Sequence, residues 1–214
     1  MRAAAGRDMI PSMRRVIVLA LAVLAASASG ASAQSAQTTV RVRGAIVDFA
    51  GQTLTIKARD GATVPVRLAD NYALMEVTRA KLADIKVGDY VGTAAVRQAD
   101  GTFRAQEVLI FPLFARGSRE GHFPWDLTRD STMTNATVAG VTTQGSGRTL
   151  TLKHKGGEVI VVVPTAAPVV TFGIGHVDQL KPGAHVFIEA SRLADGTITT
   201  TSVLVGREGL VPPM

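Results

Sequence analysis

The segment Thr53–Lys57 (TLTIK) decides the fold, because it returns later in the chain as Thr149–Lys153 (TLTLK). Apolar and polar residues alternate in both copies, which is the pattern of a β-strand buried on one face. Upstream, Gly44 reappears at the same spacing as Gly140. Such self-similarity indicates a duplicated β module.

A second pair of motifs extends the repeat toward the end of each module. Lys86–Gly88 (KVG) and Asp100–Thr102 (DGT) return as Lys181–Gly183 (KPG) and Asp195–Thr197 (DGT). The predicted domains are a first module over residues 34–111, a linker over 112–135 and a second module over 136–214. A period of this length is too long for a solenoid.

Each module is predicted to hold five strands. We place them near residues 40–49, 52–58, 63–68, 90–97 and 103–111, and again near 137–144, 149–153, 158–163, 184–192 and 198–205. A short helix is predicted within Thr78–Ile85, and a turn or short helix near 175–180. Three strands, a short helix and two strands are the order of an OB-type barrel. The predicted fold is therefore all-β, with two tandem small OB-like five-stranded barrels joined by an ordered linker; a flatter five-stranded sandwich is the alternative.

These motifs also resemble an exported bacterial family of a domain of unknown function, which is built of tandem OB-like β-barrels. The resemblance rests on Thr53–Lys57, Ile85–Asp89, Asp100–Thr102 and Ala105–Val108. Some relatives carry labels that mention metal transport or a transporter permease. A permease needs several spanning helices, which the sequence after its first 33 residues does not provide.

The first 33 residues have the composition of a signal peptide. Arg14 and Arg15 precede the apolar stretch Val16–Ala26, and Ala31–Ala33 forms a small-residue cleavage site. The predicted location is periplasmic or secreted, after Sec-type cleavage near Ala33. Removing the four Arg and one Asp of this segment lowers the net charge from +6 to +3. The rest of the chain is too mildly basic to indicate a nucleic-acid partner.

The linker is unusual because it contains the chain's only tryptophan. Flexible linkers are rich in Gly, Ser and Pro and poor in large aromatic residues, so this one is predicted to be ordered. Trp125, beside Phe123, either wedges between the two barrels or anchors a partner protein. His122, Glu120 and Asp126 supply polar groups on the same segment.

These residues support a metal site as an alternative. Imidazole and carboxylate groups in one loop suit Zn²⁺ or Cu²⁺, so His122, Glu120 and Asp126 are the candidate ligands of a transition metal. No cofactor is otherwise predicted. Because the chain has no cysteine, disulfides and thiolate metal sites are excluded.

No motif for catalysis is recognisable, and no catalytic residue is assigned. Nucleophile elbows, phosphate loops and dinucleotide fingerprints are absent from the sequence. The strands that bind nucleic acid in OB folds, here Gln52–Ala58 and Thr63–Leu68, carry no aromatic ring for stacking. Nucleic acid is therefore not an expected partner.

The sequence thus favours a soluble, exported, non-enzymatic binding or adaptor protein of the bacterial envelope. Its partner protein or small ligand is expected to contact the linker and the cleft between the barrels, through Trp125, Phe123, His122, Glu120 and Asp126. A periplasmic metal-handling protein that uses the His122 loop is the second hypothesis. An enzyme acting on envelope polymers is the third. After cleavage of the signal peptide no membrane span is expected, and the oligomeric state is left open.

Overall fold

The computed structural model describes residues 38–145 and 147–214. Everything below concerns these residues, which belong to the unit 35–214. The predicted signal peptide therefore lies outside the described residues. Within the described part of the chain, no helix has both the length and the apolar character needed to cross a bilayer.

The described residues form strands and short 3₁₀ helices, so the all-β class is confirmed. The strands are β1 (Thr38–Ala50), β2 (Thr53–Ala58), β3 (Thr63–Ala80), β4 (Tyr90–Arg97), β5 (Phe103–Ala105), β6 (Val108–Ile110), β7 (Gly121–Pro124), β8 (Ser131–Gln144), β9 (Gly147–His154), β10 (Gly157–Val163), β11 (Val169–Ile174), β12 (His185–Arg192) and β13 (Ile198–Gly206). The 3₁₀ helices are η1 (Leu82–Asp84), η2 (Leu113–Ala115), η3 (Val177–Gln179) and η4 (Arg207–Gly209).

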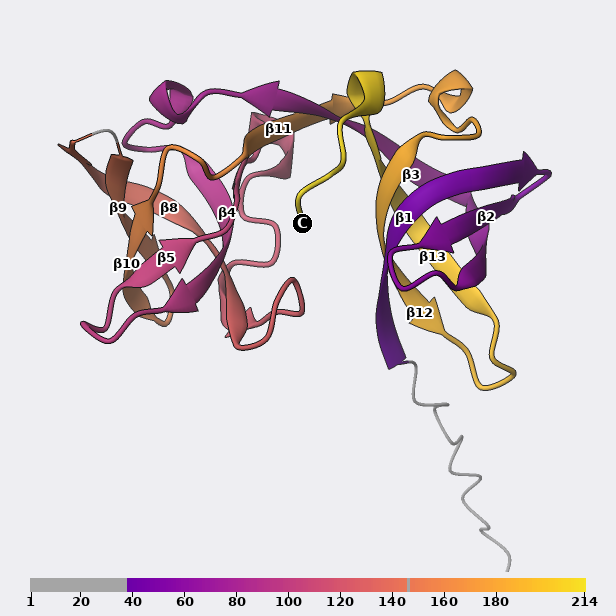
Figure 1. Ribbon diagram of the computed structural model, residues 1–214, viewed down its shortest axis with the longest axis horizontal. Helices are drawn as coiled ribbons and strands as arrows, with labels where there is room; N and C mark the ends of the chain where they lie inside the picture. Colours follow the sequence, from indigo (N-terminus) through magenta and orange to yellow (C-terminus); the bar gives the residue numbers. More distant parts are fainter. Residues whose placement is uncertain (1–37, 146) are drawn as a thin grey trace, which may run out of the picture. The chain divides into compact units, whose positions relative to one another are not determined.

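Strands from both ends of the described chain close into a five-stranded barrel, which we call the terminal ring. β1 pairs with β2, and β2 with β3, in antiparallel fashion. β12 pairs with β1, and β13 pairs with β12 and, in parallel, with β3. Figure 1 accordingly shows the indigo strands of the N-terminal segment beside the yellow strands of the C-terminal segment. The interior of the terminal ring is filled by apolar side chains: Val42, Ile46, Leu54, Ile56, Val66, Leu68, Ile188, Val203 and Val205.

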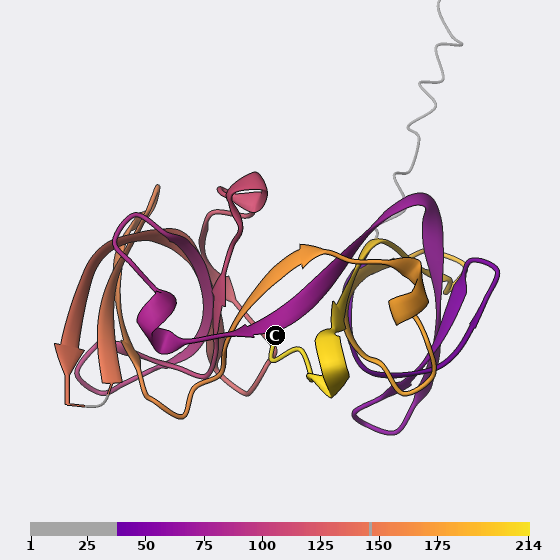
Figure 2. The ribbon, with the colours of Figure 1, turned by 90° about the horizontal axis from the view of Figure 1, so that it is seen from above.

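The middle of the chain, Tyr90–Val163, supplies a second ring of strands, which we call the central ring. β8 pairs with β4 and with β9, and β9 pairs with β10. The short strand β5 pairs with both β10 and β4, and this closes the ring. Figure 2, seen from above, shows the two rings as separate loops of ribbon. The core of the central ring contains Val91, Ala105, Val108, Ala136, Val138, Leu150, Leu152, Val161 and Val163.

The strand pairing crosses the boundary between the predicted modules. Each module was expected to close its own barrel, but β1, β2 and β3 of the first pair with β12 and β13 of the second. The two modules have equivalent alternating patterns, so either set of strands offers a matching partner. The length of β3 determines which strands pair, because β3 continues to Ala80 and its C-terminal half lies outside the terminal ring.

β3 and β11 form a ribbon that joins the two rings. The C-terminal half of β3 pairs with β11, from Met75 opposite Ile174 to Ala80 opposite Val169. β11 also pairs in parallel with β6, which lies against β4. A third apolar cluster packs here, formed by Val77, Leu109, Val170, Phe172, Phe187, Leu210 and Met214.

The predicted short helices are present as 3₁₀ helices of three residues each. Within Thr78–Ile85, the strand continues to Ala80 and only Leu82–Asp84 is helical. The turn predicted near 175–180 contains η3. The linker contains η2 and β7, and β7 pairs with the beginning of β8.

Candidate functional site

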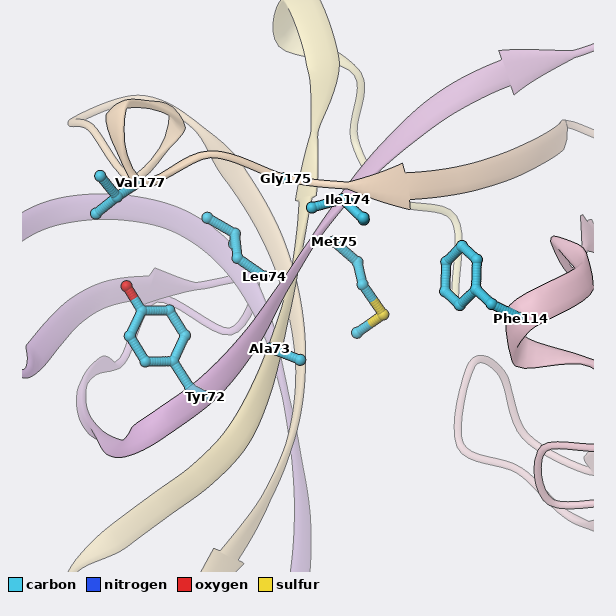
Figure 3. Close-up of a pocket in the computed structure, with 8 residues that line it drawn as sticks. All are labelled: Tyr72, Ala73, Leu74, Met75, Phe114, Ile174, Gly175 and Val177. Atoms are coloured by element: carbon cyan, nitrogen blue, oxygen red, sulfur yellow. The ribbon is translucent and has the colours of Figure 1, made fainter.

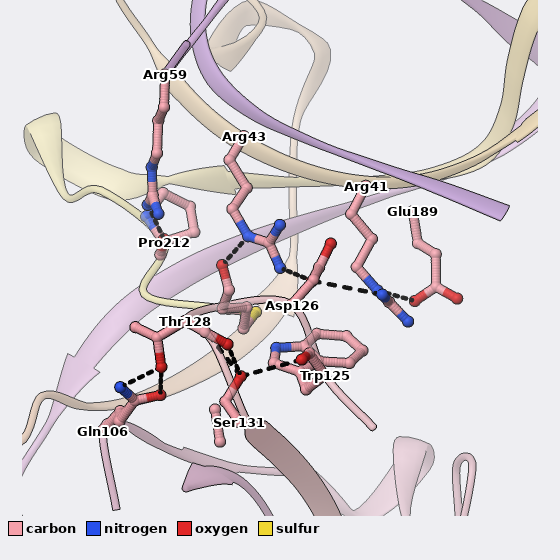
Figure 4. Close-up of polar contacts among 12 residues, drawn as sticks. Arg41, Arg43, Arg59, Gln106, Trp125, Asp126, Thr128, Ser131, Glu189 and Pro212 are labelled. Carbon is pink, nitrogen blue, oxygen red and sulfur yellow. Dashed lines mark hydrogen bonds and ion pairs between the residues drawn. The ribbon is translucent and has the colours of Figure 1, made fainter. Parts of the chain in front are cut away.

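The predicted site residue Asp126 binds the terminal ring. Its Oδ1 atom accepts a hydrogen bond from Nη2 of Arg43 at 2.7 Å and lies 3.4 Å from Nη1 of Arg41 (Figure 4). Burial alone would raise the pKa of Asp126. The hydrogen bond from Arg43 and the charges of both arginines outweigh this and lower the pKa below its usual value. Asp126 therefore serves as the acidic partner of an arginine pair.

Trp125 is part of the packing that joins the rings. The guanidinium carbon of Arg41 lies 3.9 Å from the centre of the indole ring, a cation–π distance. The rings of Phe187 and Phe123 lie 6.1 and 6.2 Å away. The indole Nε1 is buried and has no hydrogen-bond partner among the described residues. These contacts fit the interpretation in which Trp125 wedges between the rings.

Arg119 and Glu120, which are neighbours in the linker, contact opposite rings. Arg119 has a φ of 49°, forms an ion pair with Glu189 on β12, and its guanidinium carbon lies 5.1 Å from the ring of Phe123. Glu120 instead accepts a hydrogen bond from the backbone N–H of Lys155, at 2.9 Å, beside β9. The linker is thus a strap with contacts to both rings.

His122 belongs to the central-ring side of the strap. Its Nδ1 atom lies 2.8 Å from Oγ1 of Thr134, and its ring packs edge-on to Phe103 with 5.0 Å between centroids. The ring of His154 is stacked 6.4 Å away. Burial, and then the charge of His154, lower the pKa of His122, so the imidazole is neutral at pH 7.

The predicted metal ligands do not form one cluster. Asp126 is held by arginines of β1, whereas His122 and Glu120 contact groups of β8 and of the turn after β9. Within residues 38–145 and 147–214, no group of three or more His, Cys, Asp or Glu side chains has an arrangement that could hold a metal ion. The three side chains have different partners because the strap alternates between two rings.

An open recess lies elsewhere, on the ribbon that joins the rings. It has a volume of about 380 Å³ and is apolar (Figure 3). Its lining residues come from β3, β11, η2 and the start of η3: Tyr72, Ala73, Leu74, Met75, Phe114, Ile174, Gly175 and Val177. We call this set the ribbon groove.

Large apolar side chains are exposed at the ribbon groove and beside it. The exposed fractions are 67% for Phe114, 77% for Ile174 and 61% for Val177, and Leu113, next to Phe114, reaches 88%. Isolated exposed apolar residues are ordinary, but a group around a recess is typical of an interaction site. Sequence reasoning missed this group, because Leu113 and Phe114 continue the apolar run that begins at Val108 and so do not stand out as surface residues.

Local sequence explains how the groove forms. Pro112, in extended conformation, precedes η2 and turns Leu113 and Phe114 outward. Gly175 ends the β11 side, where a Cβ atom would lie 2.9 Å from Cγ of Leu74 and 3.2 Å from the backbone nitrogen of Glu76. A Cβ atom at this position would force its neighbours to shift, so glycine suits this close crossing of β3.

One buried acid lies outside the groove. Glu107, between β5 and β6, is fully buried, and its Oε1 atom accepts a hydrogen bond from the backbone N–H of Ala94 at 3.3 Å. Its Oε2 atom has no partner among the described residues. Burial raises the pKa of Glu107 to about 8, although the hydrogen bond from Ala94 and the charge of Arg43 oppose the increase. This acid occupies the point where β4 exchanges β5 for β6 as its neighbour.

Comparisons of the chain with protein-family models, with curated proteins and with solved structures found no match. The chemistry of the site therefore supplies the basis for a functional proposal. The residues that line the ribbon groove include no carboxylate, imidazole or amine. Such a lining suits apolar contact rather than acid–base chemistry.

Proposed function

We propose that the protein is an exported, non-enzymatic binding or adaptor protein of the bacterial envelope, and that the ribbon groove is the surface that holds its partner protein. The observation that supports this proposal is the group of exposed apolar side chains around an apolar recess. In the proposal each ring is an OB-like barrel that serves as a rigid support, and the strap fixes the angle between the two.

The chemistry of the groove favours a protein as the partner. Aromatic and methionine side chains, here Phe114, Tyr72 and Met75, are enriched at protein interfaces. Removing apolar area from water would supply the main free energy of association, at about 25 cal/mol per Å². The proposed contact residues still belong partly to the linker, but they are Leu113 and Phe114 rather than Trp125.

The polar residues of the strap have a supporting role in this proposal. Asp126 and Glu120 already have partners within the chain, and Trp125 is packed against Arg41. Metal handling is left without a supporting observation, because the strap does not bring together a ligand set.

A capture experiment tests the proposal. Affinity-tagged protein carrying Phe114→Ser and Ile174→Ser is compared with the unsubstituted bait in envelope extracts after chemical crosslinking. Val87→Ser is the matched control, because Val87 is 64% exposed and is not among the groove residues. Circular dichroism confirms that every bait is folded.

The proposal expects one protein to be enriched by the unsubstituted bait and by the Val87→Ser bait, and lost with the groove variant. Equal retention by all three baits would show that the partner uses another surface. Retention of nothing by any bait would contradict the adaptor function itself.

A further inference from the structure

The face that carries the ribbon groove has an apolar knob beside its recess. Leu113 is 88% exposed, more than any other large apolar residue of the described chain, and it is not among the residues that line the recess. Phe114, the next residue, forms one wall of that recess (Figure 3). Leu113 is therefore an exposed apolar residue directly before a wall of the recess, and it does not line the recess itself.

The knob is fixed in place. η2 follows Pro112 and is followed by Arg116, whose Nη1 atom donates a hydrogen bond to the backbone oxygen of Gly88 at 2.7 Å. The η2 turn is also closed by its own backbone, since the N–H of Ala115 donates to the oxygen of Pro112 at 2.9 Å. Leu113 is thus presented outward by a fixed turn, which suits insertion into another molecule.

A knob and a recess of the same chemistry on one face match the needs of a two-fold interface. In such an interface the same patch of both subunits meets itself, so each protomer must offer both halves of the contact. Rotation about a two-fold axis through the groove would bring η2 of one copy over Val177 of the other.

Charge supports the same pairing. Arg116 lies directly after the knob, and the exposed Asp178 lies directly after Val177 at the opposite end of the groove. When η2 of one copy lies over η3 of the other, Asp178 approaches the exposed Arg116, whose Nη1 atom keeps its hydrogen bond to Gly88, and the symmetry repeats this pair. Opposite charges at the rim of an apolar patch favour one orientation of docking.

We propose that the occupant of the ribbon groove is a second copy of this chain, with Leu113 of each protomer inserted into the recess of the other. This inference rests on the proposed function, since it takes the groove to be a protein-binding surface and names its partner. The dimer carries two strapped pairs of rings.

The first test measures the mass of the purified protein by light scattering after size exclusion, at loading concentrations up to about 100 µM, the range of weak interfaces. The expected mass is twice that of one chain. Leu113→Ser and Val177→Ser should each raise the dissociation constant at least about 100-fold, because every substitution occurs twice in a two-fold interface. Val87→Ser should leave the constant unchanged.

The second test uses the absence of cysteine from the chain. One preparation carries Leu113→Cys and a second carries Val177→Cys, and the two are mixed under mild oxidation. A disulfide-linked pair of chains should form in the mixture much faster than in either preparation alone, because residues 113 and 177 meet only across the interface. Asp178→Lys should slow this crosslinking and leave the fold intact by circular dichroism.

The outcomes separate this inference from the proposed function. A single-chain mass at every concentration, or a dimer unaffected by both serine substitutions, overturns the second copy as occupant. If the protein is monomeric while the groove variant still loses an envelope protein, the proposed function stands and this inference fails. If the groove-dependent dimer forms but no other protein is ever retained, self-association stands and the role as an adaptor fails.

Discussion

Replacing the buried acid, Glu107→Gln, should remove most of the pH dependence of stability. The folded protein holds the pKa of Glu107 at about 8, against an ordinary value of 4.5. Below pH 4.5 the carboxyl group is protonated in both the folded and the unfolded chain, so its burial has no pH-dependent cost. As the pH rises from 4.5 to about 8 the unfolded chain releases this proton while the folded chain keeps it, and stability falls.

The size of the effect follows from the two pKa values. Each pH unit between them costs about 1.4 kcal/mol, so the full loss is about 5 kcal/mol once the pH exceeds about 8. That amount is a large fraction of the stability of a typical domain. Glutamine has nearly the same shape as glutamate, its side-chain oxygen is able to accept the hydrogen bond from Ala94, and it has no proton to lose.

Urea unfolding, followed by circular dichroism at several pH values from 4.5 to 9, measures the effect. Near pH 4.5 the two proteins should be similarly stable, and near pH 9 the Glu107→Gln variant should be more stable by about 5 kcal/mol. Taking the difference between variant and parent cancels the titration of the other groups. Parallel pH profiles would refute the burial of an unpaired carboxyl group at this position.

Three further predictions concern the frame that supports the groove. Trp125→Ala should lower the free energy of unfolding by about 3 kcal/mol in urea titrations, because a wedge between the rings is lost; an unchanged midpoint would return Trp125 to the role of a partner anchor. Gly44→Ala should lower the free energy of unfolding by more than about 4 kcal/mol, because a Cβ atom there would lie 2.1 Å from the backbone oxygen of Lys57. Gly140 occupies the equivalent position of the repeat, and a Cβ atom there would meet nothing closer than 3.4 Å. Gly140→Ala should therefore lower the free energy of unfolding by less than about 1 kcal/mol in the same assay. Cleavage at a protease site inserted at residues 128–130, between β7 and β8, should leave both fragments in one complex on native size exclusion, and their separation would show that each half closes on its own.

The alternating sequence predicted most strands, but it did not identify their partners. Thr53–Lys57 and Thr149–Lys153 lie within β2 and β9, as their pattern indicates. The strand expected near 63–68 instead runs to Ala80, because its apolar pattern continues beyond the barrel into the ribbon. Since the two modules have similar sequences, the alternation of apolar and polar residues is compatible with strand pairing within a module and with pairing between modules. Only the three-dimensional path of β3 distinguishes these pairings.

The candidate site shows a similar limit. Glu120, His122 and Asp126 are close in sequence, and proximity favoured a shared site, yet the structure pairs them with different rings. The exposure of the groove residues was not predictable from their type, because Leu113 and Phe114 are apolar and apolar residues are expected to be buried. Glu107 interrupts the alternation of apolar and polar residues that begins at Phe103, and that interruption was the available signal for the break between β5 and β6.

The order of strands along the chain also has a consequence for folding kinetics. The central ring uses one continuous segment, Tyr90–Val163, and its closure needs only connections of moderate length. The terminal ring must bring Thr38 opposite Arg192, across nearly the whole described chain. Because contacts of long sequence separation form slowly, we expect the central ring to form early and the terminal ring to close last. Until β12 and β13 arrive, the free edges of β1 and β3 stay open to wrong pairings, so closure of the terminal ring is the step most exposed to aggregation.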